Sequence, residues 1–137
     1  MGMYTEFHCN AALKADTPPN VIKVLEFMTG QAGKMEPVGL EIPDHPLFQC
    51  SRWVFMLRCG SAYFDAPTLS IVEQSWWNWQ NVLSIRCSFK NYEGEIEKFC
   101  DWIMPYLDKV PGDFLGFSRY EETQTPDLIY AKEVNHD

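Results

Sequence analysis

The stretch Val82–Leu107, VLSIRCSFKNYEGEIEKFCDWIMPYL, decides the fold that we expect for this chain. Its first part, Val82–Phe89, alternates polar and apolar side chains, which is the period of a half-buried strand. Its second part carries apolar residues at the spacing of one helix face, and these are Ile96, Phe99, Cys100, Ile103 and Leu107. The stretch therefore predicts a strand that is followed by an amphipathic helix.

The ends of this helix carry their own signals. Asn91 is a candidate N-cap, because its side chain can accept a hydrogen bond from a free backbone N–H. Glu93, Glu95 and Glu97 follow where negative charge suits the positive end of a helix, and we expect them on the solvated surface. Pro105 breaks the helical hydrogen-bond pattern, so the helix is expected to end near Met104 or to kink there.

The N-terminal part predicts a second strand and a second helix. Tyr4–Leu13 alternates, with Phe7, Cys9, Ala11 and Leu13 on one face and Tyr4, Glu6, His8 and Asn10 on a solvated or partner-facing side. Asp16-Thr17-Pro18-Pro19 supplies a capping side chain and then proline, which is typical of a helix start. Gly30 is the expected stop.

Further segments complete the expected order of elements. Gln31–Gln49 is predicted to be a long loop, and Arg52–Cys59 a strand with Trp53, Phe55, Leu57 and Cys59 on one face. Leu69–Gln80 is interpreted as a strand that pairs with Val82–Phe89 through a turn near Asn78–Asn81, and a short helix is the alternative. Two last strands, Phe114–Glu122 and Leu128–Lys132, should form a hairpin before an end at 133–137 that frays.

This order, β-α-β-(β)-β-α-β-β, predicts a single α+β domain over residues 1–137. The nearest common arrangement is the ferredoxin-like split βαβ. It would have a mainly antiparallel sheet, two helices on one face and extra strands.

Composition narrows the function classes. Lys+Arg 11 against Asp+Glu 19 gives a net charge of −8, which disfavours direct binding to nucleic acids or anionic membranes. The chain shows neither a signal-peptide pattern nor an apolar run of about 20 residues, so we expect a cytoplasmic protein. Its five cysteines lack paired spacing and are expected to be reduced and mostly buried. No nucleotide-binding or hydrolase motif occurs, and no cofactor is predicted.

Three motifs carry a resemblance: Phe48-x-Cys50-x-Arg52-Trp53, Lys90-Asn91-Tyr92-x-x-Glu95-Ile96 and Arg119-Tyr120-Glu121-Glu122. Together they resemble segments of small uncharacterised proteins of phages and prophages, and the resemblance covers most of the chain. It implies a phage-related origin, hence a host cytoplasm, and a non-enzymatic role that it does not specify. It transfers no catalytic residue to this chain.

The segment Ser75–Asn81, SWWNWQN, has the most unusual composition. Trp77 and Trp79 would share one strand face and Trp76 would point away, which leaves at least one indole partly uncovered. Tryptophan is a frequent interface anchor, because it buries much apolar area and keeps an N–H donor. We predict Trp76, Trp77 and Trp79 as binding residues, and the alternative is that their rings complete the core or a dimer contact.

Two other sets of residues carry possible chemistry. Asp44, His45 and Cys50, with Arg52 as a nearby cation, match the residue types of a nucleophilic cysteine site. His8, Cys9, His45 and Cys50 are metal-ligating types, but their spacing matches no metal motif and no metal is predicted. Two acidic clusters are interpreted as solvated surface rather than as acid–base catalysts, and they are Glu121-Glu122 and the set Glu93, Glu95 and Glu97.

We therefore carry three hypotheses from the sequence. The first is a non-enzymatic module that binds a protein partner or a second copy, through the tryptophans or an exposed strand edge. The second is an acidic inhibitor that occupies a basic, nucleic-acid-binding surface of a host protein. The third is a cysteine-dependent enzyme centred on Cys50 and His45.

Overall fold

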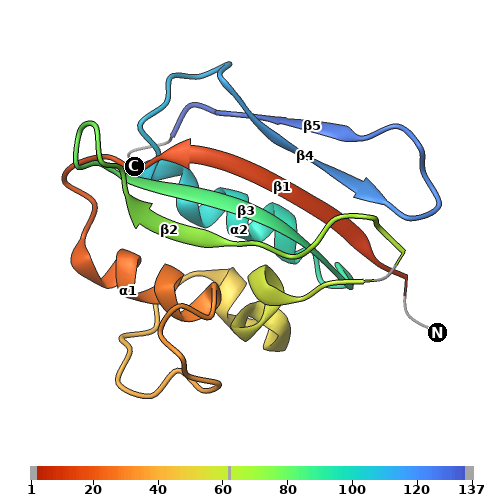
Figure 1. Cartoon of the computed structure of the whole chain (residues 1–137), viewed down its shortest axis with the longest axis horizontal. Coiled ribbons are helices and arrows are strands. Elements are labelled where there is room, and N and C mark those ends of the chain that lie inside the picture. Colours follow the sequence, from red (N-terminus) through yellow and green to blue (C-terminus); the bar gives the residue numbers. More distant parts are fainter. Residues whose placement is uncertain (1–2, 62, 135–137) are drawn as a thin grey trace.

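The computed structural model describes residues 3–61 and 63–134, so Ala62 and most of the end expected to fray lie outside it. The described elements follow the order β1-α1-β2-β3-α2-β4-β5 (Figure 1). Their bounds are Thr5–Ala12 (β1), Pro19–Met28 (α1), Ile71–Gln74 (β2), Asn81–Phe89 (β3), Glu95–Ile103 (α2), Phe114–Tyr120 (β4) and Asp127–Tyr130 (β5). No helix in these residues is long and apolar enough to cross a bilayer.

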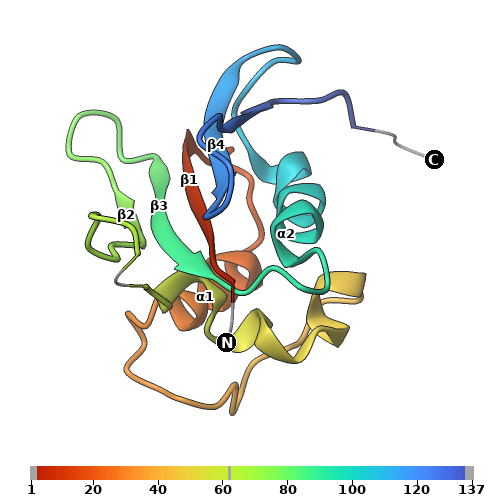
Figure 2. The ribbon, with the colours of Figure 1, turned by 90° about the vertical axis from the view of Figure 1, so that its right-hand side faces the viewer.

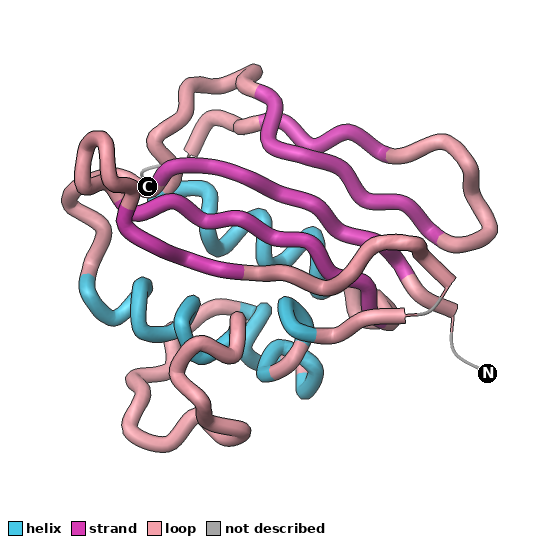
Figure 3. Tube along the Cα trace, viewed as in Figure 1, coloured by secondary structure: helices cyan, strands magenta, loops and turns pink. Residues whose placement is uncertain are grey.

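The strands form an antiparallel sheet in the order β2-β3-β1-β4-β5 (Figure 3). β1 lies at its centre and pairs with β3 from Thr5 opposite Phe89 to Ala12 opposite Val82. On its other side β1 pairs with β4. The predicted α+β class, with a mainly antiparallel sheet and two helices, is confirmed.

The alternating residues of β1 and β3 build the hydrophobic core. Phe7, Cys9, Ala11 and Leu13 are buried, as the sequence period predicted, and Leu83, Ile85, Cys87 and Phe89 are buried beside them. Helix α1 adds Val24, Leu25 and Met28 to the same core, and α2 adds Phe99, whose ring meets Phe7 edge-on at 5.9 Å. Figure 2 shows both helices packed beside the sheet. Each buried phenylalanine contributes about 2 kcal/mol of transfer free energy.

The ends of α2 follow the sequence signals in modified form. Asn91 Oδ1 accepts a hydrogen bond from the backbone N–H of Ile96 at 2.9 Å, so Asn91 does satisfy a first-turn donor. The residue next to the helix is Gly94, however, with a left-handed φ of 69°. At the other end α2 gives way to a 3-10 turn, Met104–Tyr106, and the end predicted from Pro105 is confirmed.

Helix α1 begins at Pro19, so the start predicted at Asp16–Pro19 is confirmed, but the predicted capping side chain is missing. Asp16 and Thr17 make no side-chain cap; Pro18 precedes the helix, and Thr17 Oγ1 instead donates to the Lys14 carbonyl at 2.6 Å. Gly30 follows the helix with a φ of 86°, a conformation that glycine adopts without strain, and the predicted stop is confirmed.

The strand predicted at Arg52–Cys59 is wrong. Two 3-10 turns occupy this region, Ser51–Val54 and Met56–Arg58, so the extra strand in the predicted order does not exist. The buried residues here have helical spacing, and they are Trp53, Met56 and Leu57. Phe55, which the strand pattern placed beside Trp53, is exposed. A short apolar run is compatible with both the strand period and the helix period, and the packing of Trp53, Met56 and Leu57 into the core is compatible only with the helical spacing.

Glu95 is fully buried, so the expectation that the acidic residues of the first turn are all solvated is wrong. Its Oε1 accepts the backbone N–H of Glu93 at 2.9 Å. Its Oε2 lies 3.8 Å from Nη1 of Arg52 and has no hydrogen-bond partner within the described residues. Because a buried carboxylate needs a compensating charge, Arg52 holds the loop before β2 against α2.

The segment Leu69–Gln80 contains a strand, as predicted, and the helical alternative is wrong. β2 pairs antiparallel with β3 from Ile71 opposite Ser84 to Gln74 opposite Asn81. The turn begins at Ser75 rather than near Asn78, because the backbone N–H of Ser75 already donates to the Gln80 carbonyl at 2.8 Å. The hairpin of β4 and β5 is also confirmed.

The outer edge of β2 is covered by a side chain. Gln31, which follows α1, donates from Nε2 to the Val72 carbonyl at 2.9 Å and accepts the Val72 N–H at 2.8 Å through Oε1. A side-chain amide thus reproduces the pair of hydrogen bonds that a neighbouring strand would make. This is one way in which proteins block strand addition at an edge.

Replacing Gln31 with alanine is expected to lower the free energy of unfolding by about 1 kcal/mol. The N–H and carbonyl of Val72 would then exchange their hydrogen bonds to Gln31 for hydrogen bonds to water. Urea unfolding followed by circular dichroism measures this change. Gln49→Ala removes an exposed glutamine from a 3-10 turn and serves as the control. An equal effect of the two substitutions would show that Gln31 does not support the edge.

Candidate functional site

The three predicted tryptophans lie in the turn between β2 and β3. Trp76, Trp77 and Trp79 are exposed at 82%, 65% and 70% of their surface. The expectation that Trp77 and Trp79 share a strand face is wrong, since all three residues belong to the turn. The alternative that their rings complete the core of the chain is also wrong. We call Ser75–Asn81 the tryptophan turn.

Hydrogen bonds within the tryptophan turn hold its backbone. The N–H of Trp79 donates to the Ser75 carbonyl at 3.0 Å, and the Ser75 hydroxyl donates to the Asn78 side chain. Asn78 Oδ1 also accepts the N–H of Gln80 at 3.1 Å. Gln74 closes the turn from the strand, because its Nε2 donates to the Trp79 carbonyl at 2.7 Å.

The tryptophan turn is also attached to the body of the protein. Gln80 Nε2 donates to the Leu13 carbonyl at 2.9 Å and to Oδ2 of Asp108 at 2.7 Å. These contacts link the turn to the end of β1 and to the segment after α2. The turn therefore presents its indoles from a fixed backbone rather than from a free loop.

Trp79 adopts a left-handed backbone conformation with a φ of 60°, which is uncommon for a bulky residue. Such strain is found where surrounding contacts enforce it, and often at functional sites. Trp76 and Trp77 contact each other edge-to-face, with ring centroids 5.7 Å apart. The result is an apolar protrusion with three indole N–H donors, and the sequence of the turn contains no charged residue.

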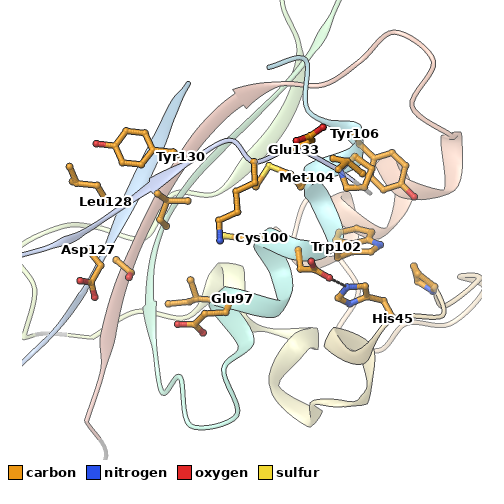
Figure 4. Close-up of a pocket in the computed structure, with 18 of the residues that line it drawn as sticks. His45, Glu97, Cys100, Trp102, Met104, Tyr106, Asp127, Leu128, Tyr130 and Glu133 are labelled. Carbon is orange, nitrogen blue, oxygen red and sulfur yellow. Dashed lines mark hydrogen bonds and ion pairs between the residues drawn. The ribbon is translucent and has the colours of Figure 1, made fainter. Parts of the chain in front are cut away.

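A second feature is a groove of about 840 Å³ between α2 and the β4–β5 hairpin (Figure 4). Apolar atoms of Cys100, Met104 and Ile129 line it. Five carboxylates within the described residues also line it, and they are Asp44, Glu97, Asp101, Asp127 and Glu133. Among the described residues that line it, only Lys132 and His45 can oppose this charge. The groove is therefore acidic with apolar walls.

The structure does not assemble a nucleophilic cysteine site from the predicted residues. Cys50 is buried, and its sulfur lies 3.7 Å from the Pro46 carbonyl and 3.6 Å from Lys98 Nζ. His45 accepts the Leu47 N–H through Nδ1, and its Nε2 contacts Asp101 at 2.8 Å. Both ring nitrogens are thus engaged elsewhere, and the thiol–imidazole contact that activates a nucleophile is missing from the described residues.

The proposed cation for that thiol has another role. Arg52 pairs with Glu95, and its guanidinium lies over the Tyr92 ring at 5.3 Å.

The residues of metal-ligating type do not form a cluster. Among residues 3–61 and 63–134, no group of three or more His, Cys, Asp or Glu side chains could hold a metal ion.

Sequence reasoning missed a polar cluster on the second face of the sheet. Glu6 is buried there, although we expected a solvated side chain. Its Oε1 lies 2.7 Å from His8 Nε2, and its Oε2 accepts a hydrogen bond from Arg119 Nη2 at 2.9 Å. The His8 ring stacks on Phe117 with centroids 4.4 Å apart. The register that places Arg119 opposite Glu6 is not readable from either strand alone, and the cluster ties β1 to β4.

No family model, curated protein or solved structure matches this chain. Its function therefore has to be argued from the geometry of its own residues.

The buried thiols predict a loss of stability at high pH. Burial raises the pKa of Cys9 to about 12, and burial also raises the pKa of Cys87. In the unfolded chain these thiols ionise near the ordinary value of 9.0, so unfolding releases protons above that pH. The contribution of each thiol to the free energy of unfolding is therefore fully present below about pH 9. It falls by about 1.4 kcal/mol per pH unit as the pH rises towards about 12.

Urea unfolding between pH 8 and pH 11 measures this dependence. Cys9→Ala removes one of the titrating thiols, so its free energy of unfolding should fall less steeply above pH 9. A slope identical to that of the native chain would show that Cys9 ionises normally in the folded state.

Proposed function

We propose that this protein is a non-enzymatic binding module that holds a partner protein through the tryptophan turn. The observation that carries the proposal is the exposure of Trp76, Trp77 and Trp79 together on one turn. Exposed apolar clusters of this kind are uncommon on monomers and mark interaction sites. Tryptophan is also among the residues that most often dominate binding energy.

The fixed backbone of the turn supports the same proposal. Binding costs less when the anchor residues are already held in place, because less conformational entropy is lost. The contacts of Gln74 and Gln80 fix the turn in the free protein. A turn that only connected two strands would need neither three indoles nor a left-handed tryptophan.

The chemistry of the turn specifies its partner. The turn is uncharged in a chain of net charge −8, so its binding depends on apolar burial rather than on ion pairs. The complementary surface is an apolar pocket whose edge offers carbonyl or carboxylate acceptors to the indole N–H groups. Such binding should change little with salt concentration.

A capture experiment with matched variants tests the proposal. The tagged native chain, a variant with all three tryptophans changed to serine, and Met35→Ser are each exposed to lysate of the source organism. Met35 is an exposed apolar residue on the loop after α1, so Met35→Ser controls for nonspecific hydrophobic binding. We expect a protein that the native chain and Met35→Ser capture in about 500 mM salt and that the triple variant does not.

Capture of the same proteins by the native chain and the triple variant would refute the proposal. Circular dichroism of the triple variant guards against misfolding. Because the replaced rings are exposed, the melting temperature should remain close to that of the native chain.

The acidic groove supports a second candidate function, in which the protein occupies a basic surface of a host protein. Its five carboxylates would face lysine and arginine side chains of the target, as a nucleic acid would. Binding of this kind weakens strongly with salt. A partner captured in about 50 mM salt, lost in about 500 mM salt and unaffected by the tryptophan substitutions would favour this candidate.

The proposal includes a finer assignment of fold and origin. We propose a ferredoxin-like split βαβ arrangement with both helices on one face and β5 as an added strand. Two observations support it: β3 lies between β1 and β2, and both helices contribute to one core. From the resemblance of its motifs we also propose a phage-related protein that acts in the host cytoplasm.

A further inference from the structure

The two edges of the sheet differ in how their backbone groups are satisfied. At the β2 edge, the amide of Gln31 occupies both the N–H and the carbonyl of Val72. At the other edge lies β5, and no side chain within residues 3–61 and 63–134 hydrogen bonds to its backbone in this way. One edge is therefore blocked, while the other is open to a further strand.

Hydrogen bonds around β5 show which of its backbone groups face outward. Ala131 donates to the Asp113 carbonyl at 2.8 Å and accepts the Gly112 N–H at 2.9 Å, so Ala131 faces the β4 side. Backbone groups alternate in direction along an antiparallel strand. The N–H and carbonyl groups of Leu128 and Tyr130 consequently point to the open edge.

Apolar side chains accompany this open edge. Leu128 and Tyr130 are exposed at 53% and 44% of their surface. Phe114, opposite Tyr130 on β4, is exposed at 55%, and the two rings meet at 5.9 Å. An open edge with apolar side chains associates with other strands unless it is covered. Asp127 is the one charged residue of β5, and Leu128–Tyr130 contains neither a charged residue nor a proline that would prevent pairing.

We propose that β5 pairs antiparallel with β5 of a second copy, about a two-fold axis at Ile129. In this register Leu128 lies opposite Tyr130 of the copy, so the outward backbone groups of both residues form hydrogen bonds. Asp127 lies opposite Ala131 of the copy, so no two like charges lie opposite each other in the paired strands. The strand is thus complementary to itself, as an isologous two-fold interface requires.

The β5 edge lies away from the tryptophan turn. That turn joins β2 to β3, and β2 is the blocked edge at the opposite side of the sheet. A dimer through β5 would form a continuous sheet of two copies with one tryptophan turn at each far side. A partner protein could then bind both copies at once and gain avidity.

Sedimentation velocity from about 1 to about 100 μM tests the dimer. The native chain should shift from monomer to dimer over this range. Leu128→Lys places a charge on the pairing edge, and Tyr130→Pro removes a backbone N–H that the alternation along β5 directs to the open edge. Both variants should remain monomeric at the highest concentration, with unchanged circular dichroism.

Two controls locate the interface. Leu69→Lys introduces the same charge at an exposed leucine near the blocked edge and should still dimerise. The triple tryptophan variant should also dimerise. A native chain that is monomeric throughout, or a dimer that survives both β5 substitutions, would overturn the proposal. Loss of the dimer in the tryptophan variant would also overturn it, whereas the capture of a partner tests only the tryptophan turn.

A crosslinking measurement tests the register directly. Hydrogen-bonded antiparallel pairs have Cα atoms about 5.5 Å apart, a separation that suits a disulfide. Leu128→Cys combined with Tyr130→Cys in one chain should form a covalent dimer under mild oxidation, and the native chain should not. Failure of the double variant to crosslink while the native chain dimerises would refute the register at Ile129.

Discussion

Replacing Gly116 with alanine is expected to lower the free energy of unfolding by about 3 kcal/mol. A Cβ atom at this position would lie 1.8 Å from the carbonyl oxygen of His8 and 2.9 Å from the Cα of Cys9. Both are backbone atoms of β1, which is paired on both sides and cannot move without loss of strand hydrogen bonds. Gly116 lies at an irregularity of β4, where the strand approaches β1 this closely. Urea unfolding followed by circular dichroism measures the effect.

Gly33→Ala is the matched control for that substitution. Gly33 has a φ of 70°, and no atom lies within 4 Å of the position of an added Cβ. Its replacement therefore costs only the strain of a left-handed residue, about 1 kcal/mol. If Gly116→Ala were no more destabilising than Gly33→Ala, the close approach of β4 to β1 would not matter for stability.

Replacing Trp77 with alanine is expected to weaken partner binding at least about 30-fold, which corresponds to about 2 kcal/mol. The indole of Trp77 is presented by a hydrogen-bonded turn and contacts Trp76 edge-to-face, so its removal deletes a preorganised anchor. Isothermal titration calorimetry with the captured partner measures the dissociation constant. Because Trp77 is exposed, the melting temperature should not change appreciably.

Met35→Ala provides the comparison for this measurement. It removes an apolar side chain that is as exposed as the tryptophans but lies on the loop after α1. We expect its dissociation constant to equal that of the native chain. Equal affinities of Trp77→Ala and the native chain would exclude this indole as an anchor and direct attention to the acidic groove.

Much of the fold was predictable from short-range patterns. The alternation in Val82–Phe89 and Tyr4–Leu13 correctly identified the two central strands and their buried faces. The apolar stripe after Asn91 identified α2, and Pro105 identified its end. These predictions succeeded because each segment is long enough to express one period, and one side of each faces the core.

The errors arose where a segment was short or where its surroundings lie far along the chain. Arg52–Cys59 satisfies two periods over a few residues, and packing made it helical. Glu95 was predicted to be solvated, because the sequence does not show that Arg52 lies beside it in the fold. The position of the tryptophan turn depended on where β2 stops pairing with β3, which is a property of the sheet.

The sequence by itself determined the class of fold, the central strands, the two helices and the presence of an unusual tryptophan segment. Only the tertiary structure decided that all three indoles face solvent, that Cys50 and His45 do not cooperate, and that one sheet edge is blocked. The physical reason is that the periodicity of a segment depends on residues that are close in sequence. Whether a side chain or a strand edge is covered depends on residues far along the chain. Gln31 reaches Val72 across the fold, and no local pattern in either segment contains that contact.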